Sequence, residues 1–444
     1  MKSGGNDMSL DFKRMERTRK EYLDEISRLS SLKFDPKKWE RLRKIVYKPQ
    51  PLDLDVIIDD TTLREGFQMA GIVTPRPDDT CRIACLLRDI GAERLEVLTY
   101  TKSDQEAIKK MQDEGLGDML AGWCRASRED VDIALKLGFR QVGISHPVSH
   151  IHFKKWEDKP LQQLMDRVVD AVEYAADHDL RIFVHGEDST RASWDFEKEF
   201  INAIAEAGAE VYRICDTIGC GKSDPDAPLP SGIPTKVKHI KEETEIPYVE
   251  FHGHDDLGNA VENTMATIKA ASDLFDKVYA STTFLGIGDR AGNAETEKII
   301  MNCYLHHGIN KWNLKPMREL ALLIASSVNY RLPLNKAIVG DAAFAHESGI
   351  HVHGVMTLPL TYETFPPELV GQKRIVRIGK RSGKHSIRIK LEKITGRKIN
   401  EKDPRLIQLV QMLKDKFVKG VRRYPIKEKE FKQYARKLGF KIKD

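Results

Sequence analysis

Short apolar runs alternate with longer amphipathic stretches between about residue 52 and about residue 310. The intervening stretches, such as 161–178 and 196–210, have the periodicity of amphipathic helices. Successive runs begin 22–40 residues apart, a spacing that suits parallel strands joined by crossover helices. Eight units in one direction predict a (β/α)8 barrel rather than an open doubly wound sheet. The runs lie at 56–58, 94–100, 119–124, 141–145, 181–185, 211–215, 248–252 and 277–282.

Polar and charged residues follow five of these runs directly. A barrel of parallel strands places its chemistry at the carboxyl ends of the strands, so this arrangement favours the barrel and predicts a site at that end. The segments are DDTTLREG after the first run, GEDSTR after the fifth, DTIG after the sixth, GHDDLG after the seventh and TFLGIGDRAGN after the eighth.

The regions on either side of the barrel predict further parts of an α/β protein. We expect a (β/α)8 TIM barrel with an N-terminal helical arm and a C-terminal helical and mixed α+β appendage. The expected boundaries are 1–51 for the arm, 52–310 for the catalytic barrel, 311–400 for a linker with a small subdomain, and 401–444 for a basic helical segment.

The composition is ordinary for a globular protein, with 41% apolar and 31% charged residues in 444. No apolar run approaches the roughly 18 residues of a membrane helix. The N-terminus lacks the apolar segment of a secretory signal. Six cysteines without paired zinc spacing are typical of reduced thiols, so we expect a cytoplasmic protein.

The net charge of +5 conceals basic termini. Residues 1–50 carry a balance of +6 and residues 411–444 a balance of +8, which leaves −9 for the residues between them. Such charges are usually the solvated faces of helices, and contact with nucleic acid or ligand phosphates is the alternative. No zinc-finger spacing or RNA-binding signature accompanies them, so a nucleic-acid partner is not expected.

His252 and His254 form an H-x-H step at the end of the seventh run. Alternation along a strand puts both imidazoles on one face, where they can bind a divalent metal, with Asp255 and Asp256 predicted to orient them. Glu65 follows the first run and is expected to reach the same mouth of the barrel. One carboxylate and two imidazoles leave metal positions open for substrate oxygens. Ordinary buried or surface histidines remain the alternative.

Two neighbouring features add candidate chemistry. Arg64 can stabilise an oxyanion or clamp a carboxylate, whereas a salt bridge with Asp60 or Glu65 is the alternative. The glycine-rich loop 285–293 follows the eighth run, where barrels often bind phosphates, although a plain turn would also explain it. Asn293 is placed to add an oxygen ligand to the metal.

Together these segments resemble the Claisen-condensing branch of the DRE-TIM metallolyase superfamily, which comprises isopropylmalate, homocitrate, citramalate and Re-type citrate synthases. The resemblance runs from about Asp60 to about His385. Its motifs are DTTLREG (60–66), GEDSTR (186–191), DTIG (216–219), HGHDDLG (252–258), GIGDRAGNAE (286–295), HESGIH (346–351) and TYE (361–363).

The resemblance implies a metal-dependent condensation of acetyl-CoA with a 2-oxo acid, followed by thioester hydrolysis. His351 and Tyr362 would be delivered into the neighbouring subunit of a domain-exchanged homodimer, with His351 as the base; without the family, packing of the appendage explains both. The implied metal is Mn, Mg, Zn or Co, held by Glu65, His252, His254 and Asn293. The catalytic residues implied are Arg64, Glu187, His351 and Tyr362. Substrate contacts are predicted for Arg64, Gln68, His152, Thr217, Gly286 and Gly288.

The 2-oxo acid is left open by the sequence. Homocitrate synthases commonly carry an arginine on strand five where this chain has Phe183, with His185 nearby, which argues against 2-oxoglutarate and suits an apolar side chain. The chain ends soon after the appendage, so the leucine feedback of isopropylmalate enzymes is not expected. For oxaloacetate, one of His146, His150 and His152 is a candidate for the second carboxylate.

Two other functions remain as alternatives. Lyases of the superfamily carry a catalytic cysteine in the glycine-rich loop, and GIGDRAGN has none, which favours condensation over an acyl-CoA lyase or aldolase. A non-catalytic barrel that binds nucleic acid or a partner through its basic tails is the other alternative.

Overall fold

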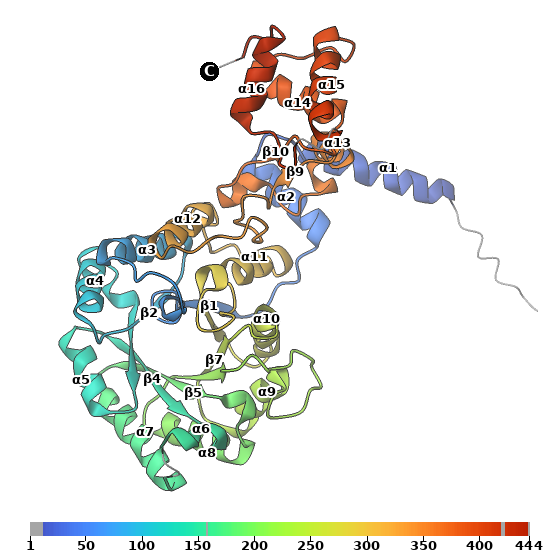
Figure 1. The fold of residues 1–444 in the computed structure, drawn as a ribbon. Helices are drawn as coiled ribbons and strands as arrows, with labels where there is room; N and C mark the ends of the chain where they lie inside the picture. The colour runs from blue at the N-terminus through green and yellow to red at the C-terminus, as the bar shows by residue number, and fades with distance from the viewer. Residues whose placement is uncertain (1–11, 157–158, 419–421, 443–444) are drawn as a thin grey trace, which may run out of the picture. The chain divides into compact units, whose positions relative to one another are not determined.

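Residues 12–156, 159–418 and 422–442 are described by a computed structural model, drawn in Figure 1. Their packing divides the chain into two compact units. The barrel unit comprises residues 49–333 and 337–339, and the terminal unit comprises residues 1–48, 334–336 and 340–444. No helix in the described ranges combines the length and apolarity needed to cross a bilayer.

Eight parallel strands close into a ring in the barrel unit, so the predicted TIM barrel is confirmed. Each strand pairs with its neighbours in sequence, and β1 pairs with β8 along its whole length to complete the ring. The strands are β1 (Asp55–Asp60), β2 (Arg94–Val97), β3 (Leu120–Arg125), β4 (Gln141–Pro147), β5 (Arg181–Glu187), β6 (Val211–Asp216), β7 (Tyr248–Gly253) and β8 (Lys277–Thr282).

Helices surround the strands, as Figure 1 shows. They form where local signals agree: Ser127 accepts the Asp130 N–H at the start of α5, and Gly91 ends α3 in the left-handed conformation. The α-helices are α3 (Pro77–Ile90), α4 (Lys102–Asp113), α5 (Arg128–Lys136), α6 (His150–Phe153), α7 (Leu161–Ala176), α8 (Trp194–Glu206), α9 (Ile233–Glu243), α10 (Ala260–Ala271), α11 (Thr296–His306) and α12 (Met317–Ser327). Short 3-10 turns are η1 (Gly66–Gln68), η2 (Gly117–Met119), η3 (Lys154–Trp156), η4 (Ser189–Arg191) and η5 (Phe284–Gly286).

The interior of the barrel changes from apolar to charged along the strands. An apolar cluster includes Phe183 and Val211. Because side chains alternate along a strand, the next residues on the same face are His185 and Arg213, nearer the carboxyl ends. Arg213 is fully buried within the ring. Charged groups therefore lie between the apolar cluster and the end of the barrel where the site is predicted.

The terminal unit is mainly helical and contains a two-stranded parallel sheet. Its C-terminal part packs around a core that includes Leu391, Leu409 and Phe431. The helices are α1 (Phe12–Leu29), α2 (Pro36–Tyr47), α13 (Gly349–Thr357), α14 (Lys384–Thr395), α15 (Pro404–Val418) and α16 (Glu428–Lys437), with η6 (Pro359–Thr361) and η7 (Pro367–Val370). The strands are β9 (Ala345–His346) and β10 (Ile375–Val376).

Candidate active site

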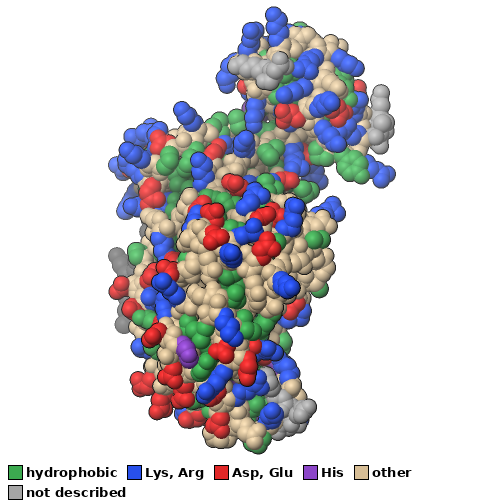
Figure 2. Space-filling view, turned by 90° about the vertical axis from the view of Figure 1, so that its left-hand side faces the viewer, with side chains coloured by type: hydrophobic (Ala, Val, Ile, Leu, Met, Phe, Trp, Pro, Cys, Tyr) green, Lys and Arg blue, Asp and Glu red, His purple; other side chains and the backbone are tan. Residues whose placement is uncertain are grey.

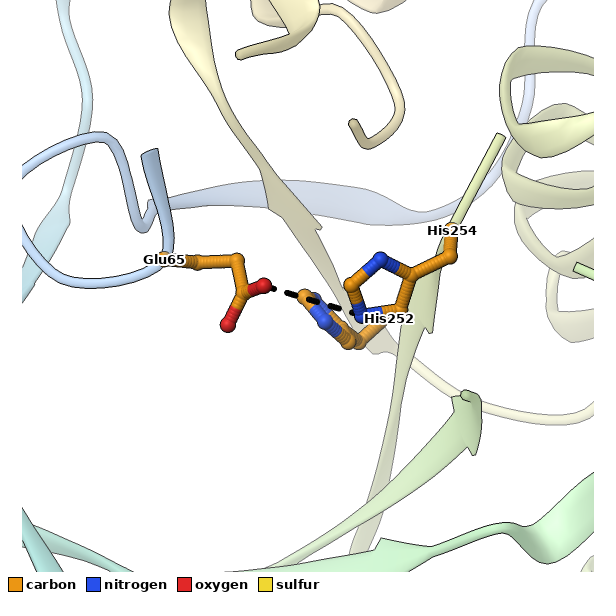
Figure 3. Close-up of side chains that lie close together, drawn as sticks. All are labelled: Glu65, His252 and His254. Carbon is orange, nitrogen blue, oxygen red and sulfur yellow. Dashed lines mark ion pairs between the residues drawn. The ribbon is translucent and has the colours of Figure 1, made fainter. Parts of the chain in front are cut away.

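Glu65, His252 and His254 bring one carboxylate and two imidazoles together at the carboxyl end of the barrel (Figure 3). One ligand atom from each side chain lies within 4.8 Å of the others, and all three residues are buried. His254 Nε2 is 3.7 Å from Glu65 Oε1. The two imidazole rings are nearly perpendicular, with centroids 5.0 Å apart. Three converging nitrogen and oxygen donors suit a divalent cation.

The local backbone explains how these three side chains converge. His252 belongs to β7, and His254 follows that strand, where its N–H donates to Asp216 O at 3.2 Å. Glu65 lies in a tight turn after β1, in which the Gly66 N–H donates to Thr61 O at 3.1 Å. Parallel pairing around the ring puts the ends of β1 and β7 at the same mouth, although nearly 190 residues separate the ligands in sequence.

Both imidazoles are held in the neutral form that binds metals. Burial lowers the pKa of His252 well below its usual value, and the positive charges of His254, when protonated, and Arg64 add to this effect. Burial also lowers the pKa of His254, against the opposing charge of Glu65. His252 Nδ1 lies 3.0 Å from Ser281 Oγ, which fixes one ring nitrogen and leaves the other for a ligand.

Two buried polar atoms beside the cluster have no hydrogen-bond partner among the described residues. They are His254 Nδ1 and Asn293 Oδ1. An antiparallel bridge joins the backbones of His254 and Asn293, so the two residues are neighbours. Buried polar atoms normally find a partner, and an unsatisfied amide oxygen here fits an additional metal contact. The donor set therefore suits the ion that the sequence predicts.

Arg64 is clamped between two carboxylates. Its guanidinium pairs with Glu65, and its Nη2 lies 2.6 Å from Glu96 Oε2. Burial would lower the pKa of Arg64, but the charges of Glu96 and Glu65 outweigh burial and raise it. Asp60 is instead hydrogen-bonded by Thr62 and Thr296. The alternative salt bridge of Arg64 is therefore present with Glu65 and not with Asp60.

A pocket of about 250 Å³ adjoins the cluster and has mainly polar walls. It brings together seven predicted site residues: Arg64, Glu65, Gln68, Glu187, Thr217, His252 and His254. Seven further residues complete the wall: Trp123, Ser145, His185, Arg213, Cys215, Asp289 and Arg290. The sequence indicates His185 only as a neighbour of Phe183. Arg213 was missed, although its signal was a charge at an inward position of a predicted strand.

A family model described as HMGL-like matches residues 55–324, which is more than half of the chain. The chain belongs to the HMGL-like family. A second model, described as Homocitrate synthase post-HMGL domain-like, matches residues 338–418. The motifs and relatives of this HMGL-like chain place it in the Claisen-condensing branch of the DRE-TIM metallolyases, so the resemblance drawn from the sequence is confirmed.

Relatives with synthase names match most of this HMGL-like chain. It is 38% identical over 340 residues to homocitrate synthase 1 of Nostoc sp., spanning 76% of this chain and 86% of the relative. It is 35% identical over 369 residues to 2-isopropylmalate synthase of Methanocaldococcus jannaschii, and the match spans 81% of this chain and 68% of the relative. The fold alone is shared with HMG-CoA lyase from Brucella melitensis, at 15% identity and a TM-score of 0.51, over 62% of this chain and 98% of that one.

Glu187 is held as a carboxylate at the pocket wall. Lys155 Nζ donates to Glu187 Oε1 at 2.6 Å, and His152 Nδ1 is 3.3 Å from the same oxygen. Burial would raise the pKa of Glu187, but the hydrogen bonds from His152 and Lys155 outweigh it and lower the pKa to about 2. Glu187 therefore carries a negative charge at neutral pH. His152 does not line the pocket and contacts it through Glu187.

The predicted role of Asp255 and Asp256 as orienting groups is wrong. Asp255 accepts the Ala260 N–H at the start of α10, and Asp256 pairs with Arg290 at 2.9 Å. Neither accepts a hydrogen bond from the two histidines in the described contacts. Asp255 and Asp256 belong to the loop after β7, and their side chains bind groups of that loop and its neighbours. Ser281, in contrast, contacts His252 from the neighbouring strand β8.

The interpretation of Phe183 as a wall for an apolar substrate is also wrong. Phe183 is buried in the apolar cluster and does not line the pocket. The guanidinium groups of Arg94 and Arg213 lie 3.9 and 5.2 Å from its ring centroid. The residue on the same strand face that reaches the pocket is His185, two positions later.

His146 and His150 do not line the pocket either. His146 is buried with its ring stacked on Phe200, and its Nδ1 lies 2.8 Å from Pro147 O. His150 packs edge-on against Phe153. Their proposed contact with a second substrate carboxylate is therefore not supported by this arrangement.

The remaining predicted residues lie in the glycine-rich loop and the terminal unit. Gly286 has a φ of +66°, and a Cβ there would come within 3.0 Å of Asn293 O. A glycine is therefore needed at position 286 for the loop to fold around Asn293. Gly288 is close to the Asn293 amide. In the terminal unit, the rings of His351 and Tyr362 lie 4.4 Å apart, and both residues are exposed.

Proposed function

We propose that this HMGL-like chain condenses acetyl-CoA with a 2-oxo acid in a metal-dependent Claisen reaction and then hydrolyses the thioester. The chain is a condensing synthase of the acyltransferase type, in keeping with relatives named isopropylmalate, homocitrate and citramalate synthases. The convergence of Glu65, His252 and His254 beside Arg64 is the observation that carries the proposal. We also propose a cytoplasmic location.

Glu65, His252 and His254 would hold the divalent cation, with Asn293 Oδ1 as a fourth contact. When bound, a cation of this kind (Mn, Mg, Zn or Co) acts as a Lewis acid on the 2-oxo group and makes its carbon electrophilic. Neutral imidazoles and a carboxylate leave positions for two oxygens of a 2-oxo acid.

Arg64 would stabilise the negative charge that develops on the 2-oxo oxygen. Its guanidinium is held in one orientation by Glu96, so little reorganisation is needed when the charge appears. Thr217 Oγ1 accepts the Asp188 N–H at 2.9 Å, which leaves its own hydroxyl proton for the substrate carboxylate. The amide of Gln68 lies in the same wall and is the other proposed carboxylate contact.

His351 and Tyr362 are the proposed pair for acetyl-CoA. In a homodimer with exchanged terminal units, His351 would take a proton from the acetyl methyl group, with Tyr362 beside it. The enolate then attacks the 2-oxo carbon and forms a malyl-type thioester. Water hydrolyses this thioester to the hydroxy acid and CoA, and the ionised Glu187 can accept a hydrogen bond from that water. Gly286 and Gly288 remain proposed substrate contacts, and His152 would act on the substrate through Glu187.

The pocket favours a 2-oxo acid with a polar far end. Ser145, His185 and Arg213 are in register on β4, β5 and β6, and all three line the pocket. Burial lowers the pKa of His185 to about 4, so its ring is neutral and adds a polar group to this wall, with Nε2 lying 3.0 Å from Glu96 Oε1. Trp123 is the one large apolar residue of the wall. We therefore propose oxaloacetate or 2-oxoglutarate rather than 2-oxoisovalerate.

A thiol-release assay tests this function directly. Chelated protein would be given acetyl-CoA, each of pyruvate, 2-oxoisovalerate, oxaloacetate and 2-oxoglutarate, and then Mg, Mn, Co or Zn. We expect CoA release that depends on metal and is fastest with a dicarboxylic 2-oxo acid. His185→Leu should reduce kcat/KM for that acid about tenfold or more, since the buried polar contact is lost. Cleavage of a malyl-type thioester without synthesis would identify a lyase instead.

A further inference from the structure

A basic groove of about 940 Å³ lies in the terminal unit, where β10, α14 and the start of α16 meet. Figure 2 shows Lys and Arg side chains gathered over this unit, at the top of the view. None of the groove residues takes part in the proposed condensation. Its ionisable lining consists of five cations and one acid: Arg377, Lys390, Arg422, Arg423, Lys427 and Glu428.

Backbone and side-chain hydrogen bonds hold the wall of the groove in place. Ile426 donates its N–H to Ile378 O at 2.7 Å, and both residues are buried in the core of the terminal unit. Arg422 folds back on its own loop, pairing with Glu430 at 2.6 Å and donating to the carbonyl of Pro425 at 3.0 Å. Arg422 therefore shapes the groove, and its charge is already compensated.

The other four cations have no carboxylate partner among the described residues. Lys390 is partly buried, and its Nζ donates only to Val376 O, at 3.0 Å. Burial lowers the pKa of Lys390, and the nearby Glu428 opposes this only in part. Arg377 donates to a backbone carbonyl at 3.2 Å, and Arg423 and Lys427 are exposed. These four cations share the groove with one acid, Glu428, so the groove keeps a net positive charge that would stabilise a bound anion.

An aromatic ring completes the groove. Tyr424 lines the groove and is 78% exposed, so its ring is accessible to a planar group. Bases stack on such rings, and several phosphates satisfy several cations at once. The volume is of the size that small-molecule sites have.

We propose that this groove binds a nucleotide, with Tyr424 stacking on the base and Arg423, Lys427 and Lys390 holding the phosphates. The cations converge on one concave site, which favours a compact ligand over an extended strand of nucleic acid. A free nucleotide and the adenosine phosphate end of coenzyme A share this chemistry. The proposal is independent of the chemistry proposed for the barrel.

Calorimetric titration of the full-length protein at physiological salt tests the proposal, with ATP, coenzyme A and inorganic pyrophosphate as probes. We expect saturable binding of ATP, weakened about tenfold or more in Arg423→Ala/Lys427→Ala because two charge-assisted contacts are lost. Tyr424→Ala should weaken the binding of ATP and leave the binding of pyrophosphate unchanged. Lys414→Ala is the matched control, since Lys414 is an exposed cation of α15 outside the groove. Circular dichroism would establish that each variant is folded.

Three outcomes would overturn the nucleotide site. In the first, neither ATP nor coenzyme A binds saturably. In the second, Lys414→Ala weakens ATP binding as much as Arg423→Ala/Lys427→Ala does, and in the third a short single-stranded RNA binds more tightly than ATP. If only coenzyme A binds, and Arg423→Ala/Lys427→Ala weakens it while the metal-site variant His252→Ala/His254→Ala does not, the groove takes the coenzyme's adenosine phosphates. Because thiol release is measured separately, failure of the groove and failure of the barrel chemistry can be told apart.

Discussion

The barrel unit has charged side chains buried in its interior, whereas most charged side chains of the terminal unit lie at the surface. By sequence the barrel unit has 32 Lys and Arg against 48 Asp and Glu, a balance of −16. The terminal unit has 40 against 19, a balance of +21. The small net charge of the chain is thus the sum of two large opposite charges.

The difference teaches where each unit can hold a ligand. Inside the barrel Arg213 contacts three buried carboxylates, Asp59 at 2.5 Å, Glu96 at 3.2 Å and Glu250 at 3.1 Å. These charged groups pair mainly with one another, whereas His254 Nδ1 at the mouth of the barrel has no hydrogen-bond partner among the described residues and is open to a ligand. In the terminal unit the surplus cations lie at the surface and remain available to an anion.

The largest expected effect on stability comes from Arg213→Met. The substitution leaves the carboxylates of Asp59, Glu96 and Glu250 buried without their shared cation, which should cost about 3–5 kcal/mol in the free energy of unfolding. Urea denaturation followed by tryptophan fluorescence measures this. A loss below about 1 kcal/mol would show that these charges are not a paired interior network.

A pH dependence should follow from His146 in the barrel unit. Burial lowers the pKa of His146 to about 4. The unfolded histidine has a pKa of about 6.5, so between these values the unfolded chain binds a proton that the folded chain does not. Stability should therefore fall as the pH drops from about 6.5 to about 4, by up to about 3 kcal/mol.

Denaturation of wild-type protein and His146→Leu at a series of pH values isolates this contribution. The variant cannot take up that proton, so its free energy of unfolding should fall less steeply in the same window. Parallel curves for the two proteins would contradict a buried neutral His146.

Ser281→Ala should weaken the metal site without unfolding the barrel. Ser281 Oγ lies against His252 Nδ1, and loss of such an orienting contact typically reduces metal affinity about 10–100-fold. Competition with a chelating dye measures the affinity. Ser145→Ala, a serine substitution elsewhere on the pocket wall, is the matched control and should leave metal affinity unchanged.

The smallest effect is expected for Arg41→Met in the terminal unit. Arg41 and Glu25 form an ion pair at 2.8 Å, but the Arg41 side chain is 68% exposed. Water and salt screen such a pair, so the free energy of unfolding should change by less than about 1 kcal/mol. A cost equal to that of Arg213→Met would remove the distinction between the two units.

Much of the barrel was predictable because burial on both sides makes its strands apolar runs. Polar residues after those runs also predicted that Glu65, His252 and His254 would meet, since strand ends converge in a closed ring. The contacts of Ser281, Glu96 and Arg213 were not predicted, because they depend on which strands are neighbours and on cross-strand register. Phe183 was misinterpreted for the same reason, since its position along the strand places it below the pocket.

The terminal unit was harder to predict for a different physical reason. Its helices are amphipathic, but their pattern does not say which other segments cover the apolar faces. The short strands β9 and β10 have two residues each, too few for a periodic signal. The groove cations lie in separate segments, because Arg423 and Lys427 follow Arg377 by 46 and 50 residues, so their convergence was visible only as a basic tail.

Metal content measured together with turnover tests the central claim most directly. After chelation and dialysis against Mn²⁺, elemental analysis of the wild-type chain should find one ion per chain and restored CoA release. His252→Ala/His254→Ala, with an unchanged circular dichroism spectrum, should bind no ion and release no CoA. A double variant that keeps either the ion or the activity would contradict a metal centre built from Glu65, His252 and His254.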